Sequence, residues 1–175
     1  VLRSMAAYER PGQVLWRYVT NRGDYPYEVG LKTPQGRLAL AVPTFHDLRT
    51  VNEIFNRGDY EPSGDAEVVV DLGANIGISA LYFLTLNDRS RVYCFEPSPV
   101  NLPRLEQALG EYAGRTTIDP RAVSDVSGTF QFNAEPVGRY GGLLNDKYTE
   151  PVVNVIEVAV IDINTALEGV RAKEP

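Results

Sequence analysis

The chain has 175 residues, enough for one ordinary domain with a short extension, and 43% of them are hydrophobic, so a globular fold with a real core is expected. Its 17 basic and 23 acidic residues leave a formal charge of -6, and no Lys/Arg run could track a phosphate backbone, so nucleic acid is not an expected partner. No segment approaches the roughly 18 apolar residues of a membrane helix, and no leader opens the sequence, so we expect a cytoplasmic protein without a membrane partner.

Residues 1–64 are expected to form an N-terminal extension made of a β-hairpin and a helix. The β-rich runs 27–31 and 37–42 flank a Pro-X-Gly turn, a pattern typical of a hairpin. Thr44 is placed to cap a helix that continues through Phe55 and ends near Gly58.

Residues 65–175 alternate short apolar runs with helical ones, which is the pattern of a parallel sheet covered on both faces. The predicted fold class is therefore α/β and Rossmann-like. Pro103 is tolerable only in the first turn of the helix expected over 98–109. Farther along, 129–132 is predicted to pair antiparallel with 152–161, and 138–142 to form a loop between them. The expected parallel strands are 68–70, 91–96 and 116–118, and the expected helices are 76–86 and 98–109.

The chemistry is expected where the first strand runs through Asp71 into a glycine-containing loop. Gly73-X-X-X-Gly77 allows a ligand to approach the start of the following helix without a Cβ in the way. Asn75 occupies the middle glycine position of the dinucleotide pattern, so the spacing disfavours an NAD-dependent oxidoreductase, which is kept as an alternative. The carboxylate of Asp71 suits a cationic ammonium, held directly or through water.

Glu96 stands at the end of the next strand, where an acidic side chain can accept hydrogen bonds from ribose hydroxyls. Pro97 and Ser98 would then lie along an adenine. The single cysteine, Cys94, excludes an internal disulfide and disfavours a zinc site, and no metal is expected. Together, the glycine loop and Glu96 predict a nucleotide-like ligand.

Three segments resemble the FkbM family of S-adenosylmethionine-dependent methyltransferases: Asp71-Leu72-Gly73-Ala74-Asn75-Ile76-Gly77, Phe95-Glu96-Pro97-Ser98-Pro99 and Ala122-Val123-Ser124-Asp125-Val126-Ser127-Gly128. The stretch from Thr50 to Tyr60 is similar to that family's lead-in. The resemblance implies a class I methyltransferase sheet that binds S-adenosyl-L-methionine and methylates a hydroxyl of a sugar, polyketide or other secondary metabolite. The cofactor residues that it implies are Asp71, Gly73, Ala74, Asn75, Gly77, Glu96, Pro97, Ser98, Ala122 and Asp125, with Glu53 and Tyr60 as weaker candidates.

The family continues beyond the segment like residues 158–164 into a buried strand with a Lys-X-Asp-X-Glu-Gly motif, which this sequence does not reach. In the usual strand order that strand pairs with the first one, so we expect 68–70 to lie at an unpaired edge and the chain to be a fragment. A truncated or non-catalytic methyltransferase-like binding module is the alternative. The oligomeric state is not indicated.

A catalytic base is hard to find because methyl transfer depends mainly on positioning, and a base assists only the acceptor hydroxyl. His46 is the sole histidine and has a suitable pKa for that role, but its place at a helix start favours capping or surface exposure. Tyr140, in the glycine-rich loop, is a weak candidate for a residue near the acceptor. The acceptor itself is not named by the sequence.

Overall fold

The computed structural model describes residues 5–60, 66–138, 141–144 and 148–174. The chain divides into two compact units. The N-terminal unit comprises Val1–Glu67 and Leu81–Ser90, and the C-terminal unit comprises Val68–Ala80 and Arg91–Pro175. Because residues 81–90 group with the N-terminal unit, the division differs from the expected boundary between residues 64 and 65, and the expected domains stay a prediction.

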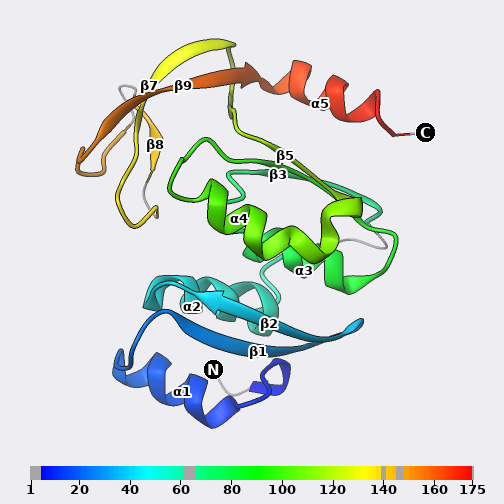
Figure 1. Ribbon diagram of the computed structural model, residues 1–175, viewed down its shortest axis with the longest axis vertical. Coiled ribbons are helices and arrows are strands. Elements are labelled where there is room, and N and C mark those ends of the chain that lie inside the picture. Colours follow the sequence, from blue (N-terminus) through cyan, green and yellow to red (C-terminus); the bar gives the residue numbers. More distant parts are fainter. Residues whose placement is uncertain (1–4, 61–65, 139–140, 145–147, 175) are drawn as a thin grey trace. The chain divides into compact units, whose positions relative to one another are not determined.

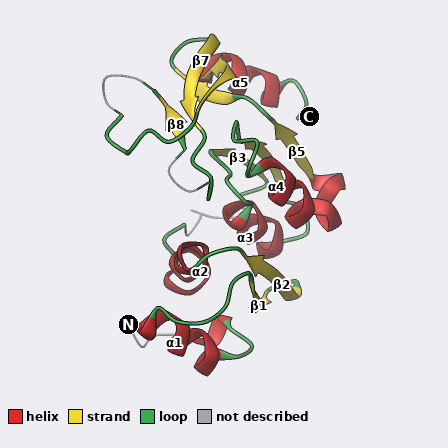
Figure 2. Cartoon of the chain, turned by 60° about the vertical axis from the view of Figure 1, so that its left-hand side comes forward, coloured by secondary structure: helices red, strands yellow, loops and turns green. Residues whose placement is uncertain are grey.

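The N-terminal unit contains the predicted hairpin. Strands β1 (Tyr27–Thr33) and β2 (Gly36–Val42) pair antiparallel, and Thr33 lies opposite Gly36 at the turn. Alternation along the two strands buries one face, made of Val29, Leu31, Leu38, Leu40 and Val42. The other elements of this unit are η1 (Met5–Ala7), α1 (Pro11–Thr20), α2 (Phe45–Val51) and the π-helical η2 (Asn52–Arg57). Figure 2 shows the helices α1 and α2.

The predicted capped helix is also confirmed. Thr44 Oγ1 accepts hydrogen bonds from the backbone N–H groups of His46 and Asp47, and Asp47 Oδ2 accepts one from the Thr44 N–H, so the two side chains form a capping box. The helix continues from α2 into η2 and ends at Gly58, whose φ of +73° suits glycine. No helix in the described part of the chain combines the length and apolarity needed to cross a membrane.

The C-terminal unit carries the predicted parallel sheet, with β3, β4 and β5 as neighbours in that order. Successive parallel strands linked by helices confirm the Rossmann-like α/β fold class. Pro103 lies in the first turn of α4, as its tolerance requires, and Figure 1 shows α4 running beside the strands. The elements in chain order are β3 (Val68–Leu72), α3 (Ile78–Leu86), β4 (Arg91–Phe95), α4 (Leu102–Leu109), η3 (Gly110–Arg115) and β5 (Thr116–Asp119). The part of α3 from Leu81 onward groups with the N-terminal unit.

A second, four-stranded sheet has the order β6-β9-β7-β8. The predicted antiparallel pairing is confirmed, because β7 runs against β9 with Gly128 opposite Val160 and Asn133 opposite Val155. The parallel pairing of β6 with β9 was not predicted. The elements are β6 (Ala122–Ser124), β7 (Gly128–Asn133), β8 (Gly142–Leu143), β9 (Val155–Asp162) and the helix α5 (Ile163–Arg171).

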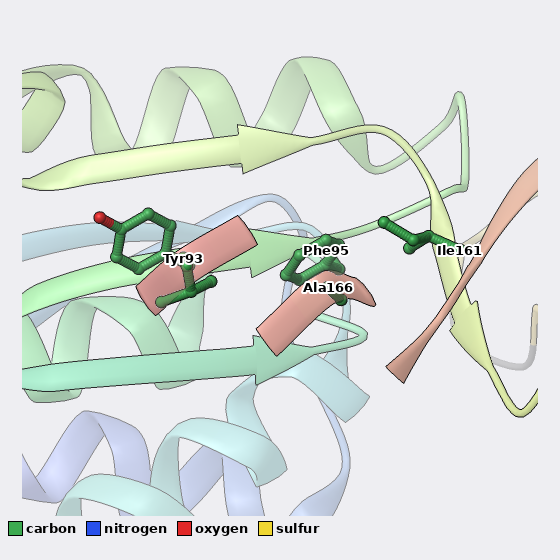
Figure 3. Close-up of a cluster of buried hydrophobic side chains, with 5 residues drawn as sticks. Tyr93, Phe95, Ile161 and Ala166 are labelled. Atoms are coloured by element: carbon green, nitrogen blue, oxygen red, sulfur yellow. The ribbon is translucent and has the colours of Figure 1, made fainter. Parts of the chain in front are cut away.

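A cluster of buried side chains joins the parallel sheet to β9 and α5. Figure 3 shows Tyr93 and Phe95 of β4 gathered with Ile161 of β9 and Ala166 of α5, and Val170 completes the cluster. Burial of each large apolar side chain contributes about 1.5–3 kcal/mol. This packing fixes the carboxyl end of β4 relative to the second sheet within the same unit.

Strand β3 has one neighbour in the described part of the chain, namely β4. Its end residues Val68 and Leu72 are 39% and 49% exposed. The expectation that this strand presents an unpaired apolar edge is therefore met by the described residues.

Cys94 lies inside β4 and is fully buried. Burial, with a smaller contribution from the charge of Asp71, raises the pKa of the Cys94 thiol to about 12. Because the thiolate is the reactive form, we expect Ellman's reagent at pH 8 to label the native chain at least about a hundredfold more slowly than free cysteine. Unfolding in urea should expose one reactive thiol per chain, and rapid labelling of the native chain would contradict this burial.

Candidate functional site

A cavity of about 380 Å³ opens in the C-terminal unit where the parallel strands end. Ligand sites of parallel α/β sheets lie outside the carboxyl ends of their strands. The volume falls within the range of small-molecule pockets. The cavity is lined by Leu72, Gly73, Asn75, Phe95, Glu96, Pro97, Ser98, Asn101, Ala122, Val123, Phe132, Gly138, Gly141 and Leu143.

The loop between β3 and α3 is held by the end of β4. Gly73 N–H and Ala74 N–H both donate to the Phe95 carbonyl oxygen, at 2.8 and 3.1 Å, so these donors are engaged within the protein. Gly73 and Asn75 have φ values of +83° and +51°, a left-handed conformation that glycine adopts freely and asparagine tolerates. A Cβ at Gly73 would meet no atom within 4 Å, so this position borders open space that a ligand can enter.

Glu96 collects three hydrogen bonds at the centre of the site. Its Oε2 accepts from Asn75 N–H at 2.8 Å, and its Oε1 accepts from Ser98 N–H at 2.9 Å and from Asn101 Nδ2 at 3.4 Å. The side chain is 4% exposed. Because an ionised carboxylate has about four acceptor positions, Glu96 retains room for about one more donor.

Two carboxylates near the cavity have raised pKa values. Burial raises the pKa of Glu96, its hydrogen bonds with Ser98, Asn75 and Asn101 oppose the rise, and the charge of Asp71 adds to it. Burial also raises the pKa of Asp71, and the hydrogen bond from Ser79 Oγ, 2.6 Å from Asp71 Oδ2, opposes it. Carboxylates with raised pKa values beside a cavity are frequent at functional sites.

Two buried polar atoms at the cavity have no hydrogen-bond partner among the described residues. They are Ser98 Oγ and Asn101 Oδ1, in residues that are 1% and 2% exposed. Buried polar atoms are normally paired, so such atoms at a cavity wall are suited to ligand groups. The Glu96 carboxylate and the amide oxygen of Asn101 accept hydrogen bonds, and the Ser98 hydroxyl can donate or accept one, so the three groups fit a ligand with hydroxyl and amino groups.

The structure brings together six of the predicted cofactor residues at the cavity: Gly73, Asn75, Glu96, Pro97, Ser98 and Ala122. The other four predicted residues of this unit do not line it. Ala74 is buried, Asp71 is bonded to Ser79, and Asp125 accepts from Ser124 Oγ. A Cβ at Gly77 would lie 2.9 Å from Leu105 Cδ1, so this glycine faces α4.

The remaining candidates belong to the N-terminal unit or to undescribed residues. Glu53 pairs with Arg49 at 3.9 Å, and the Tyr60 ring stacks on Phe83 with centroids 6.5 Å apart. His46 lies in the first turn of α2, where its N–H donates to the capping Thr44. Tyr140 lies outside the described residues. The proposed roles of all these residues stay predictions.

The most consequential residue that the sequence did not reveal is Asn101. Its amide bonds both Glu96 and the Gly138 carbonyl, and it makes no capping bond to α4, although it occupies the N-cap position. An Asn five residues after the strand-end acid, directly before Leu-Pro, is a helix-start signal that pointed to this position. The sequence contained no comparable signal that Phe132 and Leu143 line the cavity.

The fold and the site define an α/β protein with a polar cavity at the carboxyl ends of its parallel strands. Within the described ranges, no group of three or more His, Cys, Asp or Glu side chains is arranged to hold a metal ion.

Comparisons with known proteins point to methyltransferases. No family model matches the chain. The chain is 37% identical over 86 residues to the AMB antimetabolite synthetase AmbE of Pseudomonas aeruginosa, an overlap that covers 49% of this chain and 4% of AmbE. It is 33% identical over 66 residues to the 2-O-methyltransferase NoeI of Sinorhizobium fredii, covering 38% of this chain and 27% of NoeI.

Among solved structures, methyltransferase FkbM from Methylobacillus flagellatus KT is similar, with 20% identity, a TM-score of 0.44, and coverage of 66% of this chain and 26% of that one. The chain thus spans less than a third of the length of each of these three proteins. The similarity to methyltransferases predicted from the sequence is confirmed by NoeI.

Proposed function

We propose that the chain forms the S-adenosylmethionine-binding part of an FkbM-type O-methyltransferase that acts on a hydroxyl of a small molecule. The proposal rests above all on the cavity that gathers Gly73, Asn75, Glu96 and Ser98 at the ends of β3 and β4. In this proposal residues 65–175 are the binding domain, and residues 1–64 are an extension to it.

The cofactor would lie across the glycine loop with its ribose toward Glu96. Since three donors already bind the carboxylate, Glu96 has room for one ribose hydroxyl, and the unpartnered Ser98 hydroxyl is suited to bind a further polar group of the nucleoside. Asp71 would attract the ammonium of the methionine part through water. When bound, S-adenosylmethionine supplies an electrophilic methyl group on a sulfonium.

The chain's own contribution is to position the cofactor. The three N–H groups from Gly73 to Asn75 are engaged with β4 and Glu96, so the loop is already shaped for the ligand and little ordering is needed on binding. NoeI is named a 2-O-methyltransferase and AmbE an antimetabolite synthetase, which supports a hydroxyl acceptor and a role in secondary metabolism.

Isothermal titration calorimetry with S-adenosylhomocysteine tests this proposal. We expect the wild-type chain to bind and Glu96→Ala to bind at least about tenfold more weakly, because a hydrogen bond to a charged group contributes about 1.5–3 kcal/mol. Glu106→Ala removes an exposed carboxylate from α4 and should leave the affinity unchanged.

Glu96→Gln preserves the shape and one acceptor oxygen, so it keeps the test decisive if the alanine variant folds poorly. Circular dichroism establishes which variants are folded. Unchanged affinity in a folded Glu96 variant would contradict the ribose assignment. Fluorescence enhancement of NADH without binding of S-adenosylhomocysteine would favour an oxidoreductase and overturn the proposal.

A further inference from the structure

The turn at Val137 and Gly138 is fastened to α4 beside the cavity. Asn101 Nδ2 donates to the Gly138 carbonyl at 2.9 Å, and Arg104 Nη1 donates to the Val137 carbonyl at 3.1 Å. Asn75 Nδ2 reaches the same Gly138 carbonyl at 3.4 Å. One short turn therefore accepts hydrogen bonds from the glycine loop and from the first turn of α4.

The contact between Asn101 and Gly138 requires glycine in the turn. Gly138 has a φ of +81°, and a Cβ there would lie 2.0 Å from Asn101 Oδ1. No side chain can be accommodated without displacing the Asn101 amide, because Asn101 is itself 2% exposed. The turn therefore lies too close to Asn101 for any residue with a Cβ.

Asn101 also joins this turn to the centre of the site. The Nδ2 group that bonds Gly138 lies 3.4 Å from Glu96 Oε1, and Glu96 in turn accepts from the Asn75 N–H. Both Asn101 and Gly138 line the cavity. A displacement of the Asn101 side chain would therefore affect the turn and the carboxylate together.

Building on the proposed function, we infer that Asn101 is a positioning residue that holds the Val137–Gly138 turn against Glu96 as one wall of the nucleotide pocket. The turn shields the ligand, and Asn101 acts through Glu96 and Gly138. Loss of the Asn101 amide releases the turn and weakens ligand binding by speeding ligand dissociation.

Hydrogen exchange and ligand binding measured on the same variants test this inference. In the ligand-free protein, exchange of the peptide that covers residues 134–138 should be at least about tenfold faster in Asn101→Ala, Asn101→Asp and Gly138→Ala than in wild type, since local opening determines exchange. Asn101→Asp is isosteric but presents an oxygen to Glu96 and to the Gly138 carbonyl. Gln107→Ala, which removes an exposed amide from α4, should exchange like wild type.

The affinity for S-adenosylhomocysteine, measured well below the unfolding temperature, should fall about tenfold in the same three variants. The effects of Asn101→Ala and Gly138→Ala should be non-additive in the double variant, because both break one contact. Lower thermal stability with unchanged affinity would show a merely structural role and overturn the inference. Unchanged exchange in a folded Asn101→Ala would also overturn it.

Failure of the wild-type chain to bind S-adenosylhomocysteine would instead count against the proposed function. The exchange measurements need no ligand, so they would still decide whether Asn101 holds the turn.

Discussion

Asn133→Ala is expected to lower the free energy of unfolding by about 3 kcal/mol. Asn133 ends β7 and is fully buried, and its amide makes four hydrogen bonds. Nδ2 donates to Tyr148 Oη at 2.6 Å and to the Pro151 carbonyl at 3.0 Å, and Oδ1 accepts from the N–H groups of Val153 and Asn154 at 2.9 and 3.2 Å. Each hydrogen bond contributes about 0.5–1.5 kcal/mol. Three of the four partner residues, Pro151, Val153 and Asn154, are exposed, so water replaces part of the loss.

Urea unfolding followed by circular dichroism measures this loss. Asn133→Asp should be at least as destabilising, because it places a charge in a buried position and turns an acceptor toward the Pro151 carbonyl. Gln131→Ala, at an exposed position on the same strand, should change stability by less than about 0.5 kcal/mol. A loss below about 1 kcal/mol in Asn133→Ala would mean that this network does not hold residues 148–154 to β7.

The fold could be predicted wherever local chemistry is distinctive. The Pro-X-Gly turn and Thr44 mark a hairpin and a helix start, and apolar runs such as 68–70 mark parallel strands, because each depends on residues close in sequence. The helix α1 was missed although Pro11 in its first turn is a start signal. Its apolar residues Trp16 and Val19 are exposed, and Gly12, a weak helix former, lies in its first turn.

The helix α5 was missed for a different reason. Asp162 ends β9 and caps α5 by accepting from Thr165 N–H at 3.0 Å, so strand and helix adjoin without a loop. An apolar run that passes directly from the two-residue period of a strand to the 3.6-residue period of a helix does not show where one element ends and the next begins. The Asp-X-X-Thr spacing was the signal that could have separated the strand from the helix.

The residues of the candidate site that directly follow strands β3 and β4 were predictable from the sequence. The residues on the opposite wall of the cavity were not. Glu96 and Gly73 occupy fixed positions after strand ends, so their convergence follows from the sheet. Asn101 and Gly138 meet across 37 residues, and Asn75 and Gly138 across 63. Nothing in the local pattern of an asparagine or a glycine specifies such a distant partner.

The sequence and the structure give different explanations for the glycine at position 77. The sequence places this glycine around the cofactor, whereas in the structure a Cβ there would lie 2.9 Å from Leu105 Cδ1 and 3.5 Å from Leu109 Cγ. Both leucines are buried in α4, at 0% and 1% exposure. The backbone approach of the loop to α4 therefore accounts for glycine at this position without a ligand.

Gly77→Ala should consequently destabilise the chain by about 2–3 kcal/mol. The φ of +87° is unfavourable for alanine, and the added methyl group overpacks against Leu105. Gly110→Ala is the matched control, since Gly110 ends α4 with a φ of -54° and open space around a Cβ, and it should leave stability unchanged or raise it by up to about 1 kcal/mol. Urea unfolding and titration with S-adenosylhomocysteine on both variants separate the two roles: a packing role lowers the unfolding free energy of Gly77→Ala, whereas weakened binding with wild-type stability would return Gly77 to the cofactor site.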